Sequence, residues 1–117
     1  MSAGAADGGL VAHLLDLLAP LGPVGASRFF GGQALRLGGV QFAMVIEGVA
    51  YLRADRALAA ELESLGSEPF RYRTKRREVR VGAYWSVPDA GLDDGEQLVG
   101  WALRAVLAAR SAAKSAT

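Results

Sequence analysis

Residues 27–55 decide the fold, and their sequence is S-R-F-F-G-G-Q-A-L-R-L-G-G-V-Q-F-A-M-V-I-E-G-V-A-Y-L-R-A-D. Short apolar runs in this stretch are separated by Gly-Gly at 31–32, Gly-Gly at 38–39 and Glu-Gly at 47–48. Glycine adopts positive φ angles without steric cost, so such pairs between apolar runs are typical of tight hairpin turns. The stretch therefore predicts a meander of strands at about 24–30, 33–37, 40–46 and 49–53.

The longest of these runs, residues 40–46, is expected to form a central strand. Strand side chains alternate between the two faces of a sheet, so Phe42 and Met44 are expected on the same face, together with Val40 and Ile46. The intervening positions are mostly small or apolar as well. We therefore expect one face of the sheet to be covered by helices and the other face to be partly shielded.

Two helices are predicted on either side of the meander. Leucines at 10, 14, 17 and 18 recur at helical spacing, which predicts a helix over about 8–19 with Asp7 as its N-cap and prolines just beyond its last turn. Asp55 is expected to cap a second helix over about 56–65. Gly66 stands where a left-handed residue commonly closes a helix.

A third helix is predicted over about 94–111, because Asp93 and Glu96 have the spacing of a capping box at its start. Its sheet-facing residues are expected to be Leu98, Trp101, Ala102, Ala105 and Ala109. Further apolar residues at 99, 103, 106 and 107 widen the apolar surface beyond one stripe. The helix is therefore either deeply buried or in contact with another subunit, and a homodimer is a hypothesis to test.

A second hairpin is predicted from residues 70–74 and 78–85, in which apolar residues alternate with arginines, as at a half-buried sheet edge with a basic outer face. The basic candidates for a binding face are Arg71, Arg73, Lys75, Arg76, Arg77 and Arg80. With Glu78 they give residues 71–80 a formal charge of +5, which leaves −4 for the rest of a chain whose net charge is +1.

Three interpretations of this basic face stay open. It is a solvated strand edge whose charges prevent aggregation, a docking face for an acidic protein surface, or a track for nucleic-acid phosphates beside Tyr72 and Tyr84. The test between them is whether Arg71, Arg73 and Arg80 form one contiguous exposed face.

The composition is that of one globular domain, since 51% of the 117 residues are hydrophobic and 21% are charged. We expect the domain to span 10–111, between disordered tails at 1–9 and 112–117. The chain has no cysteine, which excludes disulfides, thiolate catalysis and cysteine-ligated zinc. No apolar run approaches the length of a membrane span, and no signal peptide is evident, so we expect a cytoplasmic protein without membrane contact.

The order of elements is a helix, a strand meander, a helix, a hairpin and a helix. That order predicts a two-layer α+β fold with a largely antiparallel sheet of about five to six strands and three helices. Six aromatic residues are expected in the interior between sheet and helices: Phe42, Phe70, Tyr51, Tyr84, Trp85 and Trp101. Tyr84 and Trp85 have opposite parity, so one of the two should point away from the helices.

Several blocks in series resemble the TfoX N-terminal domain family, the amino-terminal module of bacterial competence regulators. The blocks are L-L-A-P-L-G-P-V at 17–24, R-F-F-G-G at 28–32, F-A-M-V-I-E-G-V-A-Y-L-R at 42–53, G-S-E-P-F-R-Y at 66–72, Y-W-S-V-P at 84–88, and the last helix with its tryptophan. The family more often has Met where Phe29 stands. The motif residues expected to be structural are Arg28, Phe30, Gly31, Gly32, Tyr51, Pro69, Phe70, Tyr84, Pro88 and Trp101.

The resemblance implies an α+β domain of the secretion-chaperone-like type. It also implies a link to the transcriptional control of competence genes through protein partners. Two-domain members of the family add a carboxy-terminal helical domain that this sequence does not include. The family offers no established catalytic residues to carry over.

No catalytic or metal-binding constellation stands out in the sequence. His13 is the only histidine and has no spaced His, Cys or carboxylate cluster around it, so we expect a boundary residue of the first helix rather than a ligand or catalytic base. The glycine pairs lack phosphate-loop patterns, and no G-x-S-x-G motif occurs. Helix capping accounts for Asp93, Asp94 and Glu96.

We therefore expect no enzyme activity, no metal and no cofactor, and an enzyme with a cleft that the sequence does not reveal is the minor alternative. The expected function is a non-enzymatic interaction protein that acts in transcriptional regulation through contacts with protein partners. The main alternative is direct, weakly sequence-specific binding of nucleic acid by the basic hairpin at 71–80.

Overall fold

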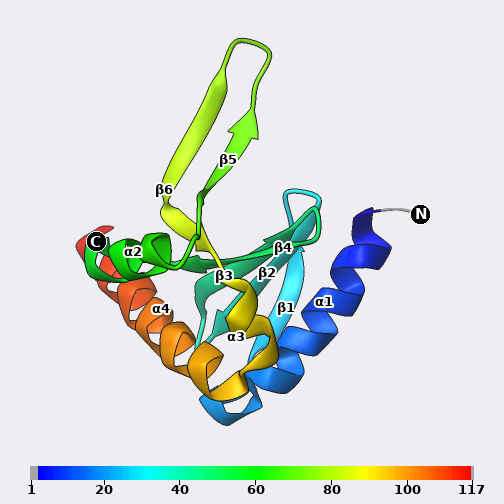
Figure 1. The fold of residues 1–117 in the computed structure, drawn as a ribbon, viewed down its shortest axis with the longest axis vertical. Coiled ribbons are helices and arrows are strands. Elements are labelled where there is room, and N and C mark those ends of the chain that lie inside the picture. The colour runs from blue at the N-terminus through cyan, green and yellow to red at the C-terminus, as the bar shows by residue number, and fades with distance from the viewer. Residues whose placement is uncertain (1–2, 117) are drawn as a thin grey trace.

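The structure is a computed structural model that describes residues 3–116, with the surroundings of side chains given for 8–114. The strands are β1 (Gly25–Phe29), β2 (Gly32–Leu37), β3 (Val40–Ile46), β4 (Val49–Arg53), β5 (Pro69–Arg73) and β6 (Glu78–Ser86). Within the described residues they form one antiparallel sheet in the order β1-β2-β3-β4-β6-β5 (Figure 1). The predicted α+β fold with its antiparallel sheet is confirmed.

Two-residue turns connect the four strands of the meander. The two central residues of each turn have positive φ angles, between 49° and 84°. This geometry matches the right-handed twist of paired strands, and it confirms the turns predicted at 38–39 and 47–48. The first turn differs from the prediction, because it consists of Phe30 and Gly31 while Gly32 already belongs to β2. A Cβ atom on Gly32 would collide with the main-chain oxygen of Val45 on β3, so this glycine is required for the close approach of two strands.

A β-bulge in β3 reverses the predicted side-chain alternation. Leu35 pairs with Ala43, but the next residue, Arg36, pairs with Gln41, so Phe42 is an extra residue on β3. Phe42 and Ala43 therefore both belong to the hydrophobic core, whereas Met44 lies on the opposite face of the sheet. The expectation that Phe42 and Met44 share a face is wrong, because one inserted residue shifts every later side chain to the other face.

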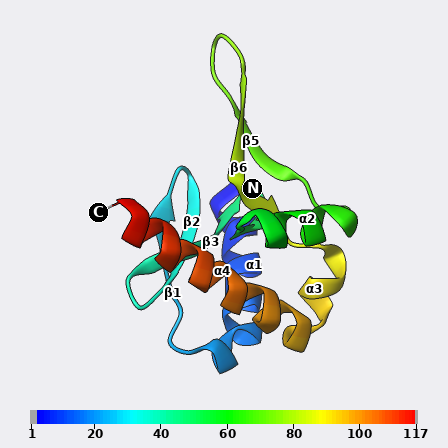
Figure 2. The ribbon, with the colours of Figure 1, turned by 90° about the vertical axis from the view of Figure 1, so that its left-hand side faces the viewer.

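The helices are α1 (Ala3–Leu17), a 3-10 turn η1 (Ala19–Leu21), α2 (Arg56–Ser64), α3 (Asp89–Asp93) and α4 (Gly95–Ala116). Helix α4 packs across β3 and β4, and α1 packs against β2 and β3, on the same side of the sheet (Figure 2). Helix α1 begins before the predicted start, so Asp7 lies inside the helix and is not its N-cap. Prolines at 20 and 23 follow the end of α1, as predicted.

Helix α2 has both of its predicted caps. The Asp55 carboxylate accepts a hydrogen bond of 2.8 Å from the main-chain N–H of Leu58. Gly66 follows the helix with a φ of 95°, and its N–H donates to the Glu63 carbonyl at 3.0 Å. These contacts satisfy main-chain groups at both helix ends, which is why the predicted limits of 56–65 differ from α2 by one residue.

The predicted third helix corresponds to α4, which begins one residue later than expected. A short helix that the sequence did not predict, α3, comes before it and follows directly after Pro88. Asp94, rather than Asp93, caps α4, because its carboxylate accepts from the main-chain N–H of Gln97 at 3.2 Å. Helix α4 then continues to Ala116. Helical structure thus extends into the segments predicted as tails, and the domain limits of 10–111 stay a prediction; residues 1–2 and 117 lie outside the described residues.

The hydrophobic core lies between the helices and one face of the sheet. All five predicted sheet-facing residues of α4 are buried: Leu98, Trp101, Ala102, Ala105 and Ala109. Val106 is buried with them, whereas Leu103 and Leu107 remain 50% and 55% exposed on the outer side of the helix. In the part of the chain that the structure describes, no helix is both long and apolar enough to cross a membrane.

Candidate functional site

The β5–β6 hairpin projects from the body of the molecule (Figure 1). Strand β6 pairs with β4 only at residues 84–86, and the rest of the hairpin extends beyond the sheet. Within the hairpin, Pro69 pairs with Trp85 but Phe70 pairs with Val81, so residues 82–84 are extra residues on β6. Such an irregularity bends a strand, and this bend turns the hairpin away from the plane of the meander.

Thr74 fixes the tip of this hairpin. Its main-chain N–H donates to the Arg77 carbonyl at 2.8 Å. Its hydroxyl oxygen accepts from the main-chain N–H groups of Arg76 and Arg77 at 3.3 and 3.2 Å. The turn therefore holds its main chain with local hydrogen bonds and leaves the side chains at 75–77 in solvent.

All six basic residues predicted for the binding face are exposed, but they are not equivalent. Arg71 and Arg80 are paired neighbours, and Arg73 lies on the same side of the two-stranded ribbon, opposite Glu78. These three arginines therefore share one face, as the predicted test requires. That face also contains an acidic residue, so it is not uniformly basic.

Two of the arginines already have partners. The Arg71 guanidinium lies 3.5 Å from a Glu78 carboxylate oxygen and 3.8 Å from one of Glu68. The Arg80 guanidinium lies over the Trp85 ring at 5.6 Å. Of these six basic side chains, those of Arg73, Lys75, Arg76 and Arg77 have no ion pair or ring partner among the described residues. The uncompensated positive charge of the hairpin is thus concentrated at its tip.

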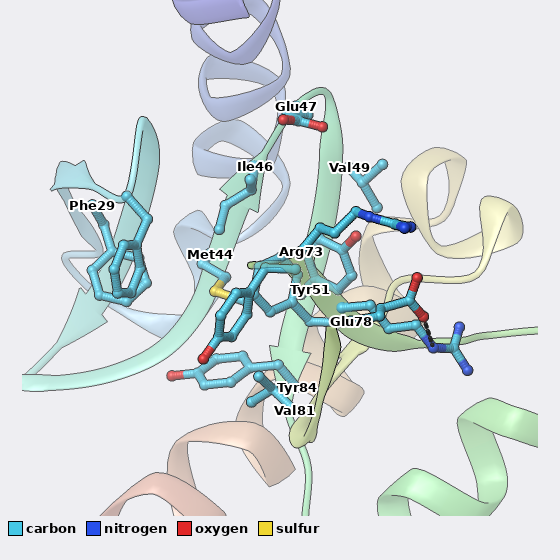
Figure 3. A pocket seen from close by; sticks show the side chains of 14 residues that line it. Phe29, Met44, Ile46, Glu47, Val49, Tyr51, Arg73, Glu78, Val81 and Tyr84 are labelled. Carbon is cyan, nitrogen blue, oxygen red and sulfur yellow. Dashed lines mark ion pairs between the residues drawn. The ribbon is translucent and has the colours of Figure 1, made fainter. Parts of the chain in front are cut away.

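A groove of about 910 Å³ lies between this hairpin and the face of the sheet that the helices leave uncovered (Figure 3). Met44, Tyr51 and Tyr84 contribute to it from β3, β4 and β6. Their neighbours along the strands, such as Val45 and Leu52, belong to the core beneath α1 and α4. Strand alternation therefore places the groove on the opposite side of the sheet from the helices.

Aromatic rings dominate the surface of the groove. Six line it: Phe29, Phe30, Tyr51, Phe70, Tyr72 and Tyr84. Tyr51 and Phe70 meet edge to face with ring centres 5.1 Å apart, and Phe29 and Phe30 do so at 4.6 Å. This geometry is favourable for aromatic pairs and holds the rings in defined positions.

Three large apolar side chains around the groove are exposed to solvent, and they come from three different parts of the sheet. They are Phe30 in the β1–β2 turn at 81%, Val49 at the start of β4 at 40%, and Tyr72 on β5 at 47%. Exposed apolar residues that gather at one concave site are typical of a contact surface, whereas isolated ones are not.

The groove corrects the predicted positions of half of the aromatic residues. Phe42, Trp85 and Trp101 belong to the core, as expected. Tyr51, Phe70 and Tyr84 line the groove instead of the interior between sheet and helices. The opposite parity of Tyr84 and Trp85 is confirmed, since only Trp85 joins the core. The bend in β6 brings the hairpin rings to this face, and the bulge in β3 adds Met44 to it; neither irregularity has a clear sequence signal.

Charged groups border the aromatic surface. Glu47 lies in the β3–β4 turn, and Arg71, Arg73 and Glu78 come from the hairpin. Burial raises the pKa of Tyr51, and the carboxylates of Glu47 and Glu68 raise it further. The Tyr51 hydroxyl is therefore protonated at neutral pH and able to donate a hydrogen bond.

The residues that line the groove include no Ser, Thr, Cys, His or Lys. The lining combines aromatic and apolar side chains with a few charged groups, an arrangement that suits recognition of an apolar or aromatic group beside a charged one. His13 lies on α1, away from these residues, where its Nε2–H donates to the Leu92 carbonyl at 2.6 Å. No group of three His, Asp or Glu side chains suited to a metal ion occurs among the described residues.

The structure divides the family-motif residues between fold and site. Gly32, Pro69, Tyr84, Pro88 and Trp101 are buried. Phe30, Tyr51 and Phe70 line the groove, while Arg28 and Gly31 are exposed at or beside the first turn. The groove is also lined by residues that the sequence did not indicate as site residues: Phe29, Met44, Ile46, Val49 and Val81. Their contribution depends on strand register and not on any local motif.

The model of the TfoX N-terminal domain family matches residues 16–109, a span that runs from the end of α1 through most of α4. No curated protein matches the chain. Since the matched span covers the sheet, the groove and the basic hairpin together, the chain belongs to the TfoX N-terminal domain family.

Proposed function

We propose that this protein is a non-enzymatic cytoplasmic binding module that acts in transcriptional regulation through protein contacts, and that the aromatic groove is its contact surface. Membership of the TfoX N-terminal domain family supports a regulatory domain. The observation that carries the proposal is the convergence of exposed apolar side chains on one groove. Phe30, Val49 and Tyr72 reach it from three separate elements.

The energetics favour a protein partner for such a surface. Covering apolar surface contributes about 25 cal/mol per Å², so each newly buried ring contributes roughly 1.5–3 kcal/mol. Residues that dominate binding energy in protein interfaces are enriched in Tyr, Trp and Arg. Tyr72 faces the groove, and Arg73, the next residue on β5, lies at its border. A partner that covers these side chains gains apolar contact and charge complementarity together.

Site-specific photo-crosslinking tests this proposal. A photoreactive phenylalanine analogue replaces Phe30 in the groove, and the same analogue replaces Leu107, which is also exposed, on the outer side of α4. We expect a discrete protein adduct from position 30 in cells, and loss of that adduct in the Tyr72→Ala background. Equal adducts from both positions, or none from position 30, would contradict the proposal. An adduct between two copies through position 107 alone would instead indicate a homodimer formed through α4.

Direct nucleic-acid binding is the second candidate, and the geometry of the hairpin tip favours it. Arg73, Lys75, Arg76 and Arg77 have no ion-pair partner among the described residues, and the tip projects from the molecule. Basic side chains on a projecting β-ribbon can follow a phosphate backbone. This mode of binding would be largely independent of sequence.

A salt titration of binding to labelled duplex and single-stranded DNA tests this second candidate. The triple variant Lys75→Ala/Arg76→Ala/Arg77→Ala is compared with the wild type and with Tyr72→Ala. Each phosphate contact contributes roughly 0.7–0.9 to the logarithmic salt slope, so the triple variant should flatten the slope by about 2–3. An absence of binding at low salt in all three proteins would exclude this function for the hairpin.

A further inference from the structure

We propose that the free edge of β5 binds an extended segment of a protein partner as an added β-strand, and that acidic residues alternate with apolar residues in that segment. This inference rests on the proposed function, because the apolar side chains of the segment would occupy the aromatic groove. Beyond the proposed function, it specifies an extended conformation and a negative charge for the partner segment.

The first support is the main chain of β5. Strand β5 is the last strand of the sheet and, among the described residues, pairs with β6 alone. Thr74 donates its N–H to the Arg77 carbonyl, so the alternation of an antiparallel ladder makes Tyr72 and Phe70 the next residues bonded to β6. The N–H and C=O groups of Arg71 and Arg73 therefore point away from β6. Outward groups at alternate positions are the pattern that an added strand requires.

The second support is the difference between the two faces of β5. Phe70 and Tyr72 face the groove, where the Phe70 ring lies 5.1 Å from that of Tyr51. Arg71 and Arg73 alternate with them along the strand and lie at the border of the groove. A strand added beside β5 continues both faces, so every second side chain of the segment lies over the groove. In Figure 1 the free edge of β5 is on the side of the β1–β2 and β3–β4 turns, which carry Phe30 and adjoin Val49.

The third support is charge. Residues 71–80 carry a formal charge of +5, and Arg73 has no ion pair among the described residues. Arginines on a strand edge repel a second basic strand, and for this reason two copies of β5 would not pair edge to edge. The same arginines attract acidic side chains at the alternate positions of an incoming segment. The edge therefore selects an acidic partner and disfavours a second copy of this chain.

Peptide binding measured by fluorescence anisotropy tests the inference on the whole chain. The probe is a labelled peptide D-F-E-V-D-Y-E, and its controls are D-D-E-E-F-V-Y, which has the same composition without alternation, and K-F-K-V-K-Y-K, which reverses the charge. We expect the alternating acidic peptide to bind at least tenfold more tightly than either control. Equal binding of the permuted peptide would overturn strand addition.

Two substitutions at one position separate charge from main-chain bonding. Arg73→Ala removes the charge and keeps the outward N–H, and we expect about threefold weaker binding. Arg73→Pro also removes that N–H without removing a hydrogen bond to β6, and we expect its affinity for the peptide to be about fivefold lower than that of Arg73→Ala. Arg56→Ala, which removes an exposed arginine on α2, should leave binding unchanged. Equal affinities for the Ala and Pro variants at position 73 would overturn the edge contact.

Amide hydrogen exchange in the wild type gives a readout that does not depend on any variant. The amides of Arg71 and Arg73 should exchange rapidly in the free protein and become protected by the alternating peptide, whereas those of Phe70 and Tyr72 are already bonded. Binding without this protection would overturn the inference. If no peptide binds but position 30 still captures a protein, the proposed function stands and the strand-addition model fails. Duplex DNA binding without peptide binding would likewise overturn it.

Discussion

Phe30 occupies a main-chain conformation that suits asparagine or glycine better than an aromatic residue. Its φ is 49°, in the first central position of a turn completed by Gly31, whose φ is 77°. Its side chain is 81% exposed. Little in the folded chain compensates for this conformation, and we therefore expect Phe30→Asn to leave the protein as stable as before, or slightly more stable, while it weakens binding at the groove.

The expected magnitude follows from two opposing terms. A left-handed conformation costs an ordinary residue roughly 1–2 kcal/mol, whereas Asn-Gly is the preferred pair in this turn type. The edge-to-face contact between Phe29 and Phe30, with ring centres 4.6 Å apart, stabilises by about 0.5–1.5 kcal/mol, and its exposure favours the lower value. Phe30→Asn should therefore raise the free energy of unfolding by about 0.5 kcal/mol, or the melting temperature by about 2 °C.

Urea unfolding followed by the fluorescence of the buried Trp85 and Trp101 measures this change. Gly31→Ala is the control, because no atom of another residue lies near its added Cβ and only the positive φ opposes it. Gly31→Ala should lower the free energy of unfolding by about 1 kcal/mol, and observing this loss would show that the assay detects the strain of a left-handed conformation. A loss above about 1 kcal/mol for Phe30→Asn would show that the ring is structural. Such a loss would refute the role of the Phe30 ring as an exposed contact residue.

Three further predictions concern the interior and two titrating groups. Gly32→Ala should lower the free energy of unfolding by about 3 kcal/mol or more in the same urea assay, because its Cβ meets main-chain oxygen of β3 that cannot move aside. Spectrophotometric titration should place Tyr51 above its usual pKa of 10.0, and Glu47→Gln should lower that pKa in part, since burial is the larger cause. Hydrogen bonds from the Arg104 guanidinium and the Trp101 indole lower the pKa of Glu61. The stability that these hydrogen bonds contribute should be fully present above the usual glutamate pKa of 4.5, and it should be lost as pH falls through the lowered pKa. Thermal unfolding measured at several pH values tests this, because Glu61→Gln should weaken the dependence of stability on pH in that range.

The turns and caps were predictable from the sequence because their causes are local. Positive φ at 38–39 follows from two glycines, and the start of α2 follows from Asp55, whose carboxylate reaches an N–H only three residues away. The cap that was predicted at the wrong residue also has a local explanation. Asp93 lost its expected role because α3 already includes it, and Asp94 caps α4 instead.

The faces of the strands were harder to predict, because they depend on register. One extra residue at Phe42 sends Met44 to the groove, although alternation from Val40 places the two side chains together. Three extra residues in β6 bend the hairpin over the sheet. Neither insertion has a composition that distinguishes it from regular strand, since strand sequences specify alternation but not the partner opposite each residue.

The sequence by itself determined the strand meander, the caps of α2, the concentration of positive charge at 71–80 and the family. Each depends on neighbours in the chain or on several motifs in series. Only the tertiary structure decided that Phe30, Tyr51 and Tyr72 surround one groove, since these residues are far apart in sequence and meet through strand pairing and a bend. It also decided which arginines keep their charge uncompensated, because ion pairs require carboxylates that only folding brings near.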